Sequence, residues 1–280
     1  MPTLIELFTD PISLAFFGLF AALWIVEARF PARALTPIRG HRRRAVASLL
    51  AYFLMSSYLP LLIAPWFEPL RLFDLSSLGA WGGGLAVYLV YQVFGYAYHR
   101  TLHRFDGLFR AVHQMHHSAE RLDVASAFYF SPLDMLGWTL VSTVALSVVG
   151  VTPSATVVFL LFGTFLSTFQ HANLNTPQWL GYVVQRPESH SHHHARGVHA
   201  MNYADLPIVD LVFGTFVNPR DFAADTGFYD GASARVGDML RCRDVTEPRL
   251  SRAATLRRRL PLGANGSTQG AEAAAVLDRS

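Results

Sequence analysis

Five long apolar stretches, separated by short polar segments, fill most of the chain between residues 12 and 170. Each holds close to the ~20 residues that a helix needs to cross about 30 Å of hydrocarbon. The stretches cover residues 12–28, 46–67, 79–98, 133–151 and 155–170. Because 79–98 and 133–170 also fit partly re-entrant helices, the pattern predicts an all-α, integral membrane helical bundle with about four to five membrane-spanning helices.

The charges around the first stretch distinguish a retained span from a cleaved leader. The first 28 residues contain no basic residue, and Arg29 and Arg33 follow the apolar run. A secretory signal peptide carries its positive charges before its apolar run. The order therefore predicts a retained membrane span whose N-terminus lies outside.

All 23 basic residues are arginines, and their positions follow the predicted spans. With the N-terminus outside, the inside segments 29–44, 99–127 and 171–280 hold 22 of them, and Arg71 alone lies outside. Inside segments of membrane proteins are enriched in positive residues, whereas a soluble helical protein would not sort its charges in this way. We therefore expect an inside face that is cytosolic, in a membrane that is the bacterial cytoplasmic membrane.

The composition agrees with a membrane protein. Apolar residues make up 51% of the chain and charged residues 15%, and the mean hydropathy is +0.27. Since a soluble domain carries roughly a quarter charged residues, this chain lacks the polar surface to cover itself in water. The same figures exclude intrinsic disorder, coiled coil and collagen. The single cysteine, Cys242, excludes disulfide frameworks and multi-cysteine metal sites.

Three regions follow from these patterns. Residues 1–78 hold the N-terminal spans and an arginine-rich cytosolic loop, and residues 79–217 hold most of the histidines. Residues 218–280 form a cytosolic tail, whose end from Thr246 is rich in arginine, glycine, alanine and serine. This composition predicts partial disorder and attraction to anionic lipid headgroups. Without interleaved aromatic residues, the basic tail does not indicate nucleic-acid binding.

Eleven of the 12 histidines lie between residues 99 and 199, and eight of them form three motifs. The motifs are H-x3-H at His99 and His103, and H-x2-H-H at His113, His116 and His117 and again at His190, His193 and His194. Positions i, i+3 and i+4 share a helix face, so we expect each motif to aim two or three imidazoles in one direction. Imidazole suits Fe, Zn, Cu and Ni, and eight rings exceed the needs of one ion. The motifs predict a polynuclear metal site in a cytosolic, histidine-rich helical cap.

The predicted topology brings the motifs together. Residues 118–189 separate the second motif from the third, and two membrane crossings in this segment return the chain to the side that it left. His171 lies at the cytosolic end of the last span. It could complete the ligand set, or it could hydrogen-bond to the backbone as an interfacial histidine.

Several elements around these histidines resemble the fatty acid hydroxylase/sterol desaturase superfamily of membrane di-iron oxygenases. Residues 113–118 read HQMHHS, and His171 and Asn173 form an HxN element after the helical hairpin. Pro187 stands three residues before the third motif, and the segment 202–216 reads NYADLPIVDLVFGTF. The resemblance therefore rests on several separate elements in the family's order.

The resemblance covers residues 90–217 and implies two iron ions, O₂ as co-substrate, and a lipid substrate that is hydroxylated or desaturated. The iron ligands that we expect are the motif histidines with His171 as a ninth: His99, His103, His113, His116, His117, His171, His190, His193 and His194. Electrons would come from a separate donor of the cytochrome b5, ferredoxin or reductase type, because the sequence has no flavin, haem or ferredoxin motif. No catalytic residue is expected beyond the metal ligands.

Other polar residues near the motifs are candidates for supporting roles. Asp210 and Asn175 could orient a ligand's second ring nitrogen, and Asp210 could equally cap a helix. His199 lies close enough in sequence to the third motif to be a reserve ligand, and His192 is expected to be accessory. The family usually carries Arg or Lys where this chain has Ser191 and His192, so the sequence does not favour a sterol over other lipids.

The residues alone leave other functions open. A zinc-dependent membrane hydrolase would need a carboxylate general base, and Glu120 and Glu188 are the only glutamates near the motifs. A non-enzymatic haem protein would place paired histidines inside two facing spans, and a transporter would place ionisable residues in mid-membrane. The motif histidines instead lie beyond the ends of the predicted spans.

Overall fold

The computed structural model describes residues 1–248. This part of the chain consists of helices and loops without a β-strand, and an isolated bridge joins Ala195 to Thr226. The prediction of an all-α protein is confirmed. Residues Met1–Glu247 form one compact unit. The tail that the sequence predicts to be partly disordered lies, beyond residue 248, outside the described residues.

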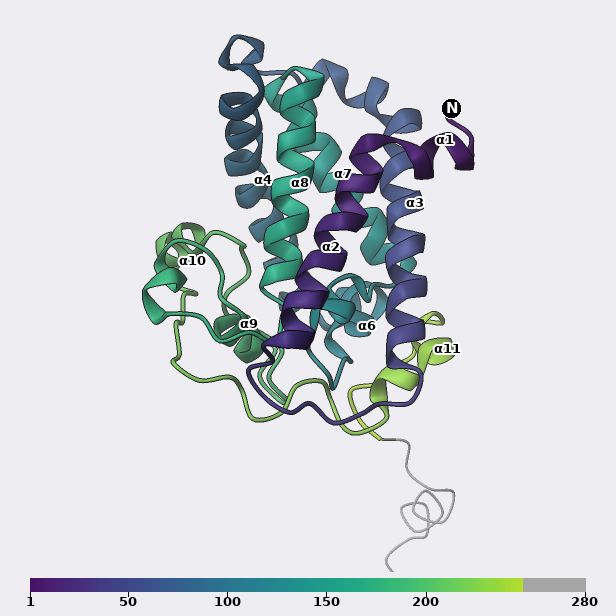
Figure 1. The fold of residues 1–280 in the computed structure, drawn as a ribbon, viewed down its shortest axis with the longest axis vertical. Coiled ribbons are helices and arrows are strands. Elements are labelled where there is room, and N and C mark those ends of the chain that lie inside the picture. The colour runs from purple at the N-terminus through teal and green to yellow at the C-terminus, as the bar shows by residue number, and fades with distance from the viewer. Residues whose placement is uncertain (249–280) are drawn as a thin grey trace, which may run out of the picture. The chain divides into compact units, whose positions relative to one another are not determined.

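Five long helices form the bundle, and a short helix, α1 (Leu4–Thr9), precedes them (Figure 1). The side chains of Asp10, Ser131 and Thr152 cap three of these helices, and a proline follows each cap. Proline at the first helical position loses no helical hydrogen bond and presets φ, so these cap-proline pairs fix the helix starts. The long helices are α2 (Pro11–Arg29), α3 (His41–Phe67), α4 (Gly79–Arg104), α7 (Pro132–Val149) and α8 (Pro153–Phe169).

Three segments are long and apolar enough to cross a membrane, namely Pro11–Arg29, His41–Leu70 and Pro132–Val149. α8 is also apolar but has only 17 residues, and α4 falls outside this group. α4 nevertheless carries a stripe of large exposed apolar side chains at every fourth position, from Trp81 through Leu85 and Leu89 to Val93. Apolar surface of this kind suits lipid rather than water. The helices agree with the predicted membrane bundle.

Small residues allow α4 to pack closely against α8. A Cβ atom on Gly84 would lie 2.7 Å from Val158 Cγ1, and one on Gly83 would lie 2.9 Å from Ala155 Cβ. α4 also contacts α7, which in turn contacts α3, and α8 contacts α2. These contacts fix the last turns of α4, which carry the first histidine motif.

The labelled short helices α6, α9, α10 and α11 lie at one end of the bundle (Figure 1). At the start of this series a π-helical turn, η3, replaces regular α-helix and carries His113. The 3-10 turns η1 (Glu68–Leu70) and η2 (Ser76–Leu78) instead connect α3 to α4. The remaining short elements are α5 (Asp106–Leu108), η3 (Phe109–His113), α6 (Gln114–His117), η4 (Val124–Phe128), η5 (Gln178–Tyr182), α9 (Pro187–His193), α10 (Pro207–Phe213), η6 (Ala232–Ala234) and α11 (Val236–Met239).

The described start of the predicted tail folds onto this end of the bundle. Phe228, Ala232, Met239 and Val245 join Met115 of α6 in one apolar cluster. Burial of these side chains covers the second histidine motif from outside. The division of the sequence at residues 78 and 217 stays a prediction, and both positions lie within the single compact unit.

Glu27, the single acidic residue of α2, connects three segments at the end of the bundle where the short helices lie. Its Oε2 accepts the backbone N–H of Val124 at 2.8 Å and that of Asn173 at 2.9 Å. The Asn173 side chain donates to the Arg33 carbonyl oxygen at 2.7 Å. The end of α2, the start of η4 and the turn after α8 are therefore held together, and this turn carries His171.

Candidate metal centre

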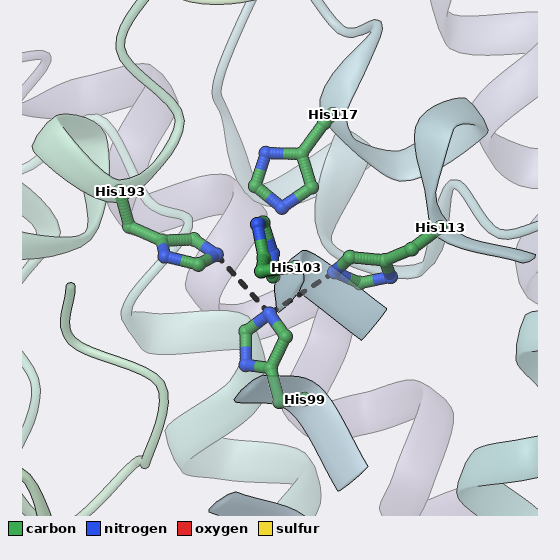
Figure 2. Close-up of side chains that lie close together, drawn as sticks. All are labelled: His99, His103, His113, His117 and His193. Carbon is green, nitrogen blue, oxygen red and sulfur yellow. Dashed lines mark hydrogen bonds between the residues drawn. The ribbon is translucent and has the colours of Figure 1, made fainter. Parts of the chain in front are cut away.

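The nine histidines that the sequence predicts as metal ligands lie in two groups at this end of the bundle. Within each group, one potential ligand atom per residue lies within 4.8 Å of all the others. The five-histidine group, drawn in Figure 2, consists of His99, His103, His113, His117 and His193. The four-histidine group consists of His116, His171, His190 and His194. The fold thus assembles these rings from segments up to about a hundred residues apart.

The two H-x2-H-H motifs divide their histidines between the groups. His113 and His117, at i and i+4, enter the five-histidine group, and His116 enters the other. In the third motif His190 and His194 enter the four-histidine group, and His193 enters the other. Positions i+3 and i+4 differ by about 100° around a helix, so neighbouring rings diverge. Each motif thus aims two of its rings into one group, as expected, and the third ring of each H-x2-H-H motif enters the other group.

Backbone carbonyl groups fix which nitrogen of two rings carries the proton. His99 Nδ1 lies 2.8 Å from the Tyr203 carbonyl oxygen, and His193 Nδ1 lies 2.7 Å from the Met201 carbonyl oxygen. Because a carbonyl oxygen can only accept, both Nδ1 atoms donate. A neutral imidazole has one N–H, so the Nε2 atoms of both rings carry lone pairs.

His113 follows the same pattern with a carboxylate. Its Nδ1 donates to Asp134 Oδ2 at 2.7 Å, which leaves a lone pair on Nε2. The Nε2 atoms of His113 and His193 lie 3.0 and 3.1 Å from His99 Nε2 (Figure 2). Three lone pairs converge here without a proton between them, an arrangement that is repulsive unless a cation is bound. A metal ion is the group that this donor set fits.

The four-histidine group also brings ring nitrogens close together at distances that suit a bound metal ion. His171 Nδ1 donates to the Ser167 carbonyl oxygen at 2.7 Å, so its Nε2 carries a lone pair. This Nε2 lies 3.1 Å from the Nε2 atoms of both His116 and His190, and His194 Nε2 lies 3.1 Å from His190 Nε2. Two imidazoles bound to one ion at about 2.0–2.1 Å have nitrogens roughly 3.0–3.4 Å apart. The observed separations match this range.

Burial keeps these rings neutral. The side chains of His117, His193 and His194 are fully buried. Burial, together with repulsion from the neighbouring rings, lowers the pKa of each well below its ordinary value. Burial similarly lowers the pKa of His171 to about 4. Neutral imidazole is the form that binds metals, so the rings can bind without losing a proton at neutral pH.

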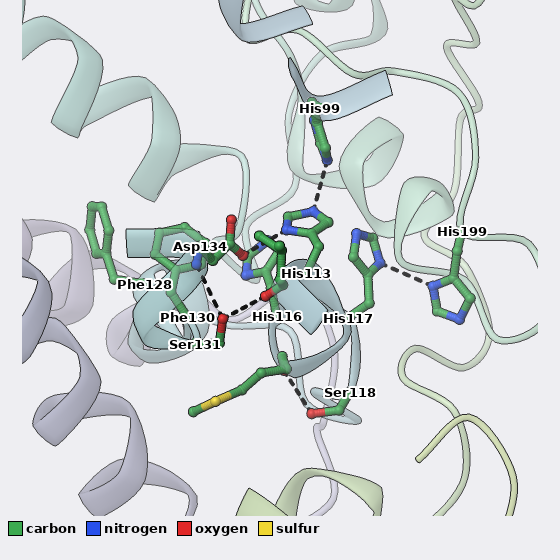
Figure 3. A network of polar contacts seen from close by, with 12 residues as sticks. His99, His113, His116, His117, Ser118, Phe128, Phe130, Ser131, Asp134 and His199 are labelled. Carbon is green, nitrogen blue, oxygen red and sulfur yellow. Dashed lines mark hydrogen bonds and ion pairs between the residues drawn. The ribbon is translucent and has the colours of Figure 1, made fainter. Parts of the chain in front are cut away.

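Asp134 is a site residue that the sequence analysis missed. It is fully buried at the start of α7, and Figure 3 shows it between this helix and the His113 ring. The Ser131 side chain caps α7 by accepting the Asp134 backbone N–H at 3.2 Å. A carboxylate inside an otherwise uncharged apolar segment was the available signal, because such residues are expensive to place in a membrane.

The loop that supplies the two carbonyl groups has an unusual backbone. Met201 and Asn202 both have positive φ angles, of 66° and 49°, which non-glycine residues rarely adopt. Asp210 accepts the backbone N–H groups of Tyr203 and Ala204 at 2.8 and 2.9 Å. Asp210 thus holds the loop rather than a ring nitrogen, and it lies inside α10 rather than at its cap.

Neither Asn175 nor Asn173 contacts a ring nitrogen of the described histidines, so the ring-orienting role suggested for Asn175 is not seen. Asn175 is exposed and forms no hydrogen bond to the described histidines. Asn173 is buried and bonded to Arg33, two residues from His171. The turn after α8 therefore directs the earlier asparagine into the protein.

His199 approaches the five-histidine group from outside. Its Nδ1 lies 3.0 Å from His117 Nδ1 (Figure 3). Burial lowers the pKa of His199 to about 4. It therefore touches a candidate ligand without belonging to either group.

The two remaining histidines bond elsewhere. His192 Nε2 donates to the Asp221 carbonyl oxygen at 3.0 Å, and His41 Nε2 lies 2.9 Å from Asp123 Oδ1. His192 is next to His193 in sequence but bonds outside both groups, so its substitution can serve as a control for substitutions of the candidate ligands.

A small cavity of about 60 Å³ lies between the two groups. Its wall includes His99 and His113 of one group and His116, His171 and His190 of the other. A substrate atom in this metal-facing cavity would be adjacent to both groups.

The chain is similar to known lipid-oxidising enzymes. The family model described as fatty acid hydroxylase matches residues 84–215, which contain all nine histidines. Human alkylglycerol monooxygenase is 29% identical over 198 residues, which is 69% of this chain. The chain spans 43% of the length of that relative. No solved structure matches the chain. The part of the chain that is similar to the fatty acid hydroxylase family, residues 84–215, thus contains both histidine groups.

Proposed function

We propose that this protein is a membrane-bound di-iron oxygenase that hydroxylates a lipid. The observation that carries the proposal is the convergence of ring lone pairs in two separate groups, because each group then suits one metal ion. An all-imidazole donor set is compatible with iron. Bound iron would supply the activation of O₂ that oxygen insertion into a C–H bond requires. The similarity of residues 84–215 to the fatty acid hydroxylase family supports this choice of metal and reaction.

The chain's own residues hold and orient the site. The carbonyl groups of Met201 and Tyr203 and the carboxylate of Asp134 fix the rings of His193, His99 and His113 with their lone pairs turned inward. Ring orientation set by such contacts reduces the reorganisation needed on metal binding. Burial excludes bulk water from both groups, so reducing equivalents are used on substrate rather than lost in side reactions.

The lipid nature of the substrate is supported by the membrane helices and by the relative. Alkylglycerol monooxygenase oxidises a lipid according to its name, and it is 29% identical to this chain over 198 residues. Desaturation is the closest alternative reaction, because it differs only in the fate of the substrate after the first C–H bond breaks. Hydroxylation consumes one O₂, two electrons and two protons, and it yields the hydroxylated lipid and one water.

The sidedness and the electron supply complete the proposal. We propose that both histidine groups lie on the cytosolic side of a cytoplasmic membrane with the N-terminus outside, and the distribution of arginines supports this. The two electrons would come from a separate cytosolic or membrane-bound donor of the cytochrome b5, ferredoxin or reductase type. We propose α4 and α8 as additional membrane-spanning helices, since α4 lies between two clear spans in the chain, α8 directly follows one, and both expose apolar side chains.

The rival functions fit the described residues less well. A zinc hydrolase would need a free glutamate, but Glu188 binds Arg186 at 3.0 Å and Glu120 accepts the N–H groups of Gly231 and Ser233. Neither glutamate lines the metal-facing cavity. A cavity of about 60 Å³ is also too small to hold a haem. The oxygenase therefore remains the function that the site supports best.

Lipid analysis in a host cell tests the proposed reaction. Cells that express the protein under ¹⁸O₂ are expected to gain one ¹⁸O atom in one class of lipid. His116→Ala should abolish this product, whereas His192→Ala should retain it, since His192 bonds away from both groups. Loss of two hydrogens would indicate desaturation instead. A product without ¹⁸O, or full activity of His116→Ala, would contradict the proposal.

A further inference from the structure

Helix α10 reverses the usual arrangement of a helix at a protein surface in water. Its one charged residue, Asp210, is fully buried. Four of its apolar side chains are exposed instead, namely Ile208, Leu211, Val212 and Phe213. A surface helix in water turns its apolar side inward and its charged side outward. The outer side of α10 therefore needs an apolar partner.

The 3-10 turn η5 and the residue after it extend this apolar surface. Trp179, Tyr182 and Val183 are exposed. The ring centroids of Tyr182 and Phe216, which follows α10, lie 5.6 Å apart, and η5 also contacts α10. The exposed side chains of the two segments thus form one surface. We call it the apolar patch, and it consists of Trp179, Tyr182, Val183, Ile208, Leu211, Val212 and Phe213.

The sequence around the apolar patch is almost free of charge. Residues 172–185 contain no aspartate, glutamate or arginine, and residues 206–219 contain Asp210 alone. Residues 235–243, at the same end of the bundle, hold three arginines and one aspartate. A protein partner usually meets a polar rim around the centre of its interface, whereas hydrocarbon disfavours charge. The composition of the patch therefore favours lipid over a protein partner.

The apolar patch continues the exposed apolar stripe of α4. The Phe213 ring stacks on that of Tyr96 at 4.8 Å, and Tyr96 lies about one turn after Val93, the last residue of the stripe. Figure 1 shows α10 at the side of the bundle, level with the lower parts of α2 and α8. Trp179 and Tyr182 are of the types enriched where a bilayer meets water. The patch thus adjoins the surface that the long helices offer to lipid.

Asp210 connects the apolar patch to the five-histidine group. Its carboxylate accepts the backbone N–H groups of Tyr203 and Ala204 and the hydroxyl group of Thr215, all at 2.7–2.9 Å. The Tyr203 carbonyl oxygen accepts the Nδ1–H of His99 at 2.8 Å. A displacement of α10 would therefore move the group that orients the His99 ring.

We infer that the apolar patch lies in the bilayer, in the leaflet on the side of the histidine groups, and that lipid contact holds α10 where Asp210 can orient the His99 ring through Tyr203. The partner of this surface is the lipid itself. α10 then lies along the membrane surface with its apolar side in lipid and Asp210 towards the protein. This inference goes beyond the proposed function and does not depend on which metal or reaction the protein uses.

Fluorescence quenching of the full-length protein in lipid nanodiscs tests the position of the apolar patch. In a Cys242→Ser background, Val212→Cys places a thiol for a bimane label at a residue that is 71% exposed. Leu240→Cys is the matched control, because Leu240 is 52% exposed but lies beside Arg241, outside the patch. We expect doxyl-labelled phosphatidylcholine to quench bimane at position 212 about threefold more than at position 240, and aqueous iodide to show the reverse order.

Three outcomes of the quenching experiment would overturn the inference. Equal quenching of the two positions by doxyl lipid would place the patch outside the bilayer, as would stronger quenching of position 212 by iodide. Protection of position 212 from both reagents would show that protein covers the patch, either a second copy of this chain or another part of it.

A charged variant tests the link between the apolar patch and the His99 ring. A carboxylate at position 212 is unfavourable in lipid, so Val212→Asp should displace α10. We expect metal-free protein in nanodiscs to bind Co²⁺ about threefold or more weakly, as measured by visible absorption. Val212→Leu keeps the patch apolar, and Leu240→Asp places the charge outside it, so both should bind Co²⁺ as the unmodified protein does. Unchanged binding by Val212→Asp would contradict the link.

The two experiments separate the inference from the proposed function. Quenching uses uncharged variants and needs no metal, so it decides the position of the patch even if Val212→Asp does not fold. If doxyl lipid quenches position 212 as expected but the protein never oxidises a lipid, the proposed function fails and the membrane contact stands. If the protein oxidises a lipid while iodide alone quenches position 212, the proposed function stands and the inference fails.

Discussion

The carboxylate and carbonyl groups that hydrogen-bond to the histidine rings determine which ring nitrogens face inward. Among the described residues, Asp134 is the one charged side chain that contacts an Nδ1 atom of the two groups, that of His113, at 2.7 Å. Carbonyl groups do the same for His99, His171 and His193. Because backbone partners cannot be removed by mutation, Asp134 is the contact that can be tested directly.

Asp134→Asn removes the negative charge while keeping the side-chain shape. We expect the affinity of the five-histidine group for metal to fall by about tenfold to hundredfold, because the His113 ring loses orientation and basicity. Titration of metal-free protein with Fe²⁺ against a competing chelator measures this change. Asp221→Asn, at an exposed position, is the control and should bind as the unmodified protein does. An unchanged affinity of Asp134→Asn would show that the contact is dispensable.

The buried histidines also make stability depend on pH. Burial lowers the pKa of His171 to about 4, below the ordinary value of 6.5 that it has in the unfolded chain. Between these values the unfolded state binds a proton that the folded state does not, so stability falls as pH decreases from 6.5 towards 4. His171 alone accounts for up to about 3 kcal/mol, and the other buried rings act in the same direction.

Thermal unfolding of metal-free protein in detergent at pH 7.5, 6.0 and 5.0 measures this dependence. We expect the midpoint to fall at each step, most steeply below pH 6. A midpoint that stays constant or rises on acidification would contradict neutral, buried rings.

At the scale of single residues, side-chain chemistry could be predicted and backbone partners could not. Three spaced motifs were enough to indicate the ligand candidates, since imidazoles at i and i+4 meet on one helix face. Met201 and Tyr203 act through their backbone carbonyl oxygens. Every residue has such an oxygen, so the residue type does not indicate these contacts. Asn173 and Asn175 are the same residue type, and only the irregular turn after α8 determines that the first side chain is buried and the second exposed.

At the scale of helices, the contact between α4 and α8 positions the first histidine motif. Gly84→Leu would force a side chain into Val158, where even a Cβ atom would lie 2.7 Å from a methyl carbon. Overpacking of this kind costs about 1–3 kcal/mol, despite the better helix propensity of leucine. We expect a lower unfolding temperature together with weaker metal binding, because His99 and His103 move with α4.

Gly18→Leu on α2 is the matched control for this prediction. No atom lies within 4 Å of the position of its Cβ, and Gly18 is exposed. The control should unfold at the same temperature as the unmodified protein or slightly above it. Equal midpoints for both variants would show that the close contact between α4 and α8 is not essential.

Helix positions were largely predictable because caps and prolines define them locally. The predicted stretch 133–151 corresponds to α7 (Pro132–Val149), and 155–170 corresponds to α8 (Pro153–Phe169). The division of each H-x2-H-H motif between two groups was not predictable. It depends on which other segments supply the facing rings, from 14 residues away for His99 and His113 to 94 for His99 and His193, and only the tertiary fold determines that.

At the scale of the whole molecule, the arginine distribution predicts that the histidine end faces the cytosol. Cys242, the single cysteine, is exposed in the described part of that end and reports on this topology. A membrane-impermeant maleimide should label Cys242 only after host cells are lysed. The double variant Cys242→Ser, Ser154→Cys moves the thiol to an exposed position at the start of α8 and should be labelled in intact cells. The opposite pattern would reverse the topology.

The central claim is that the two histidine groups each hold one iron ion. Metal analysis of protein purified without oxygen tests this most directly. The account predicts about two irons per chain, and about one iron for His171→Ala, which removes a ring from the four-histidine group alone. Zinc in place of iron, a bound haem, or two irons retained by His171→Ala would contradict it.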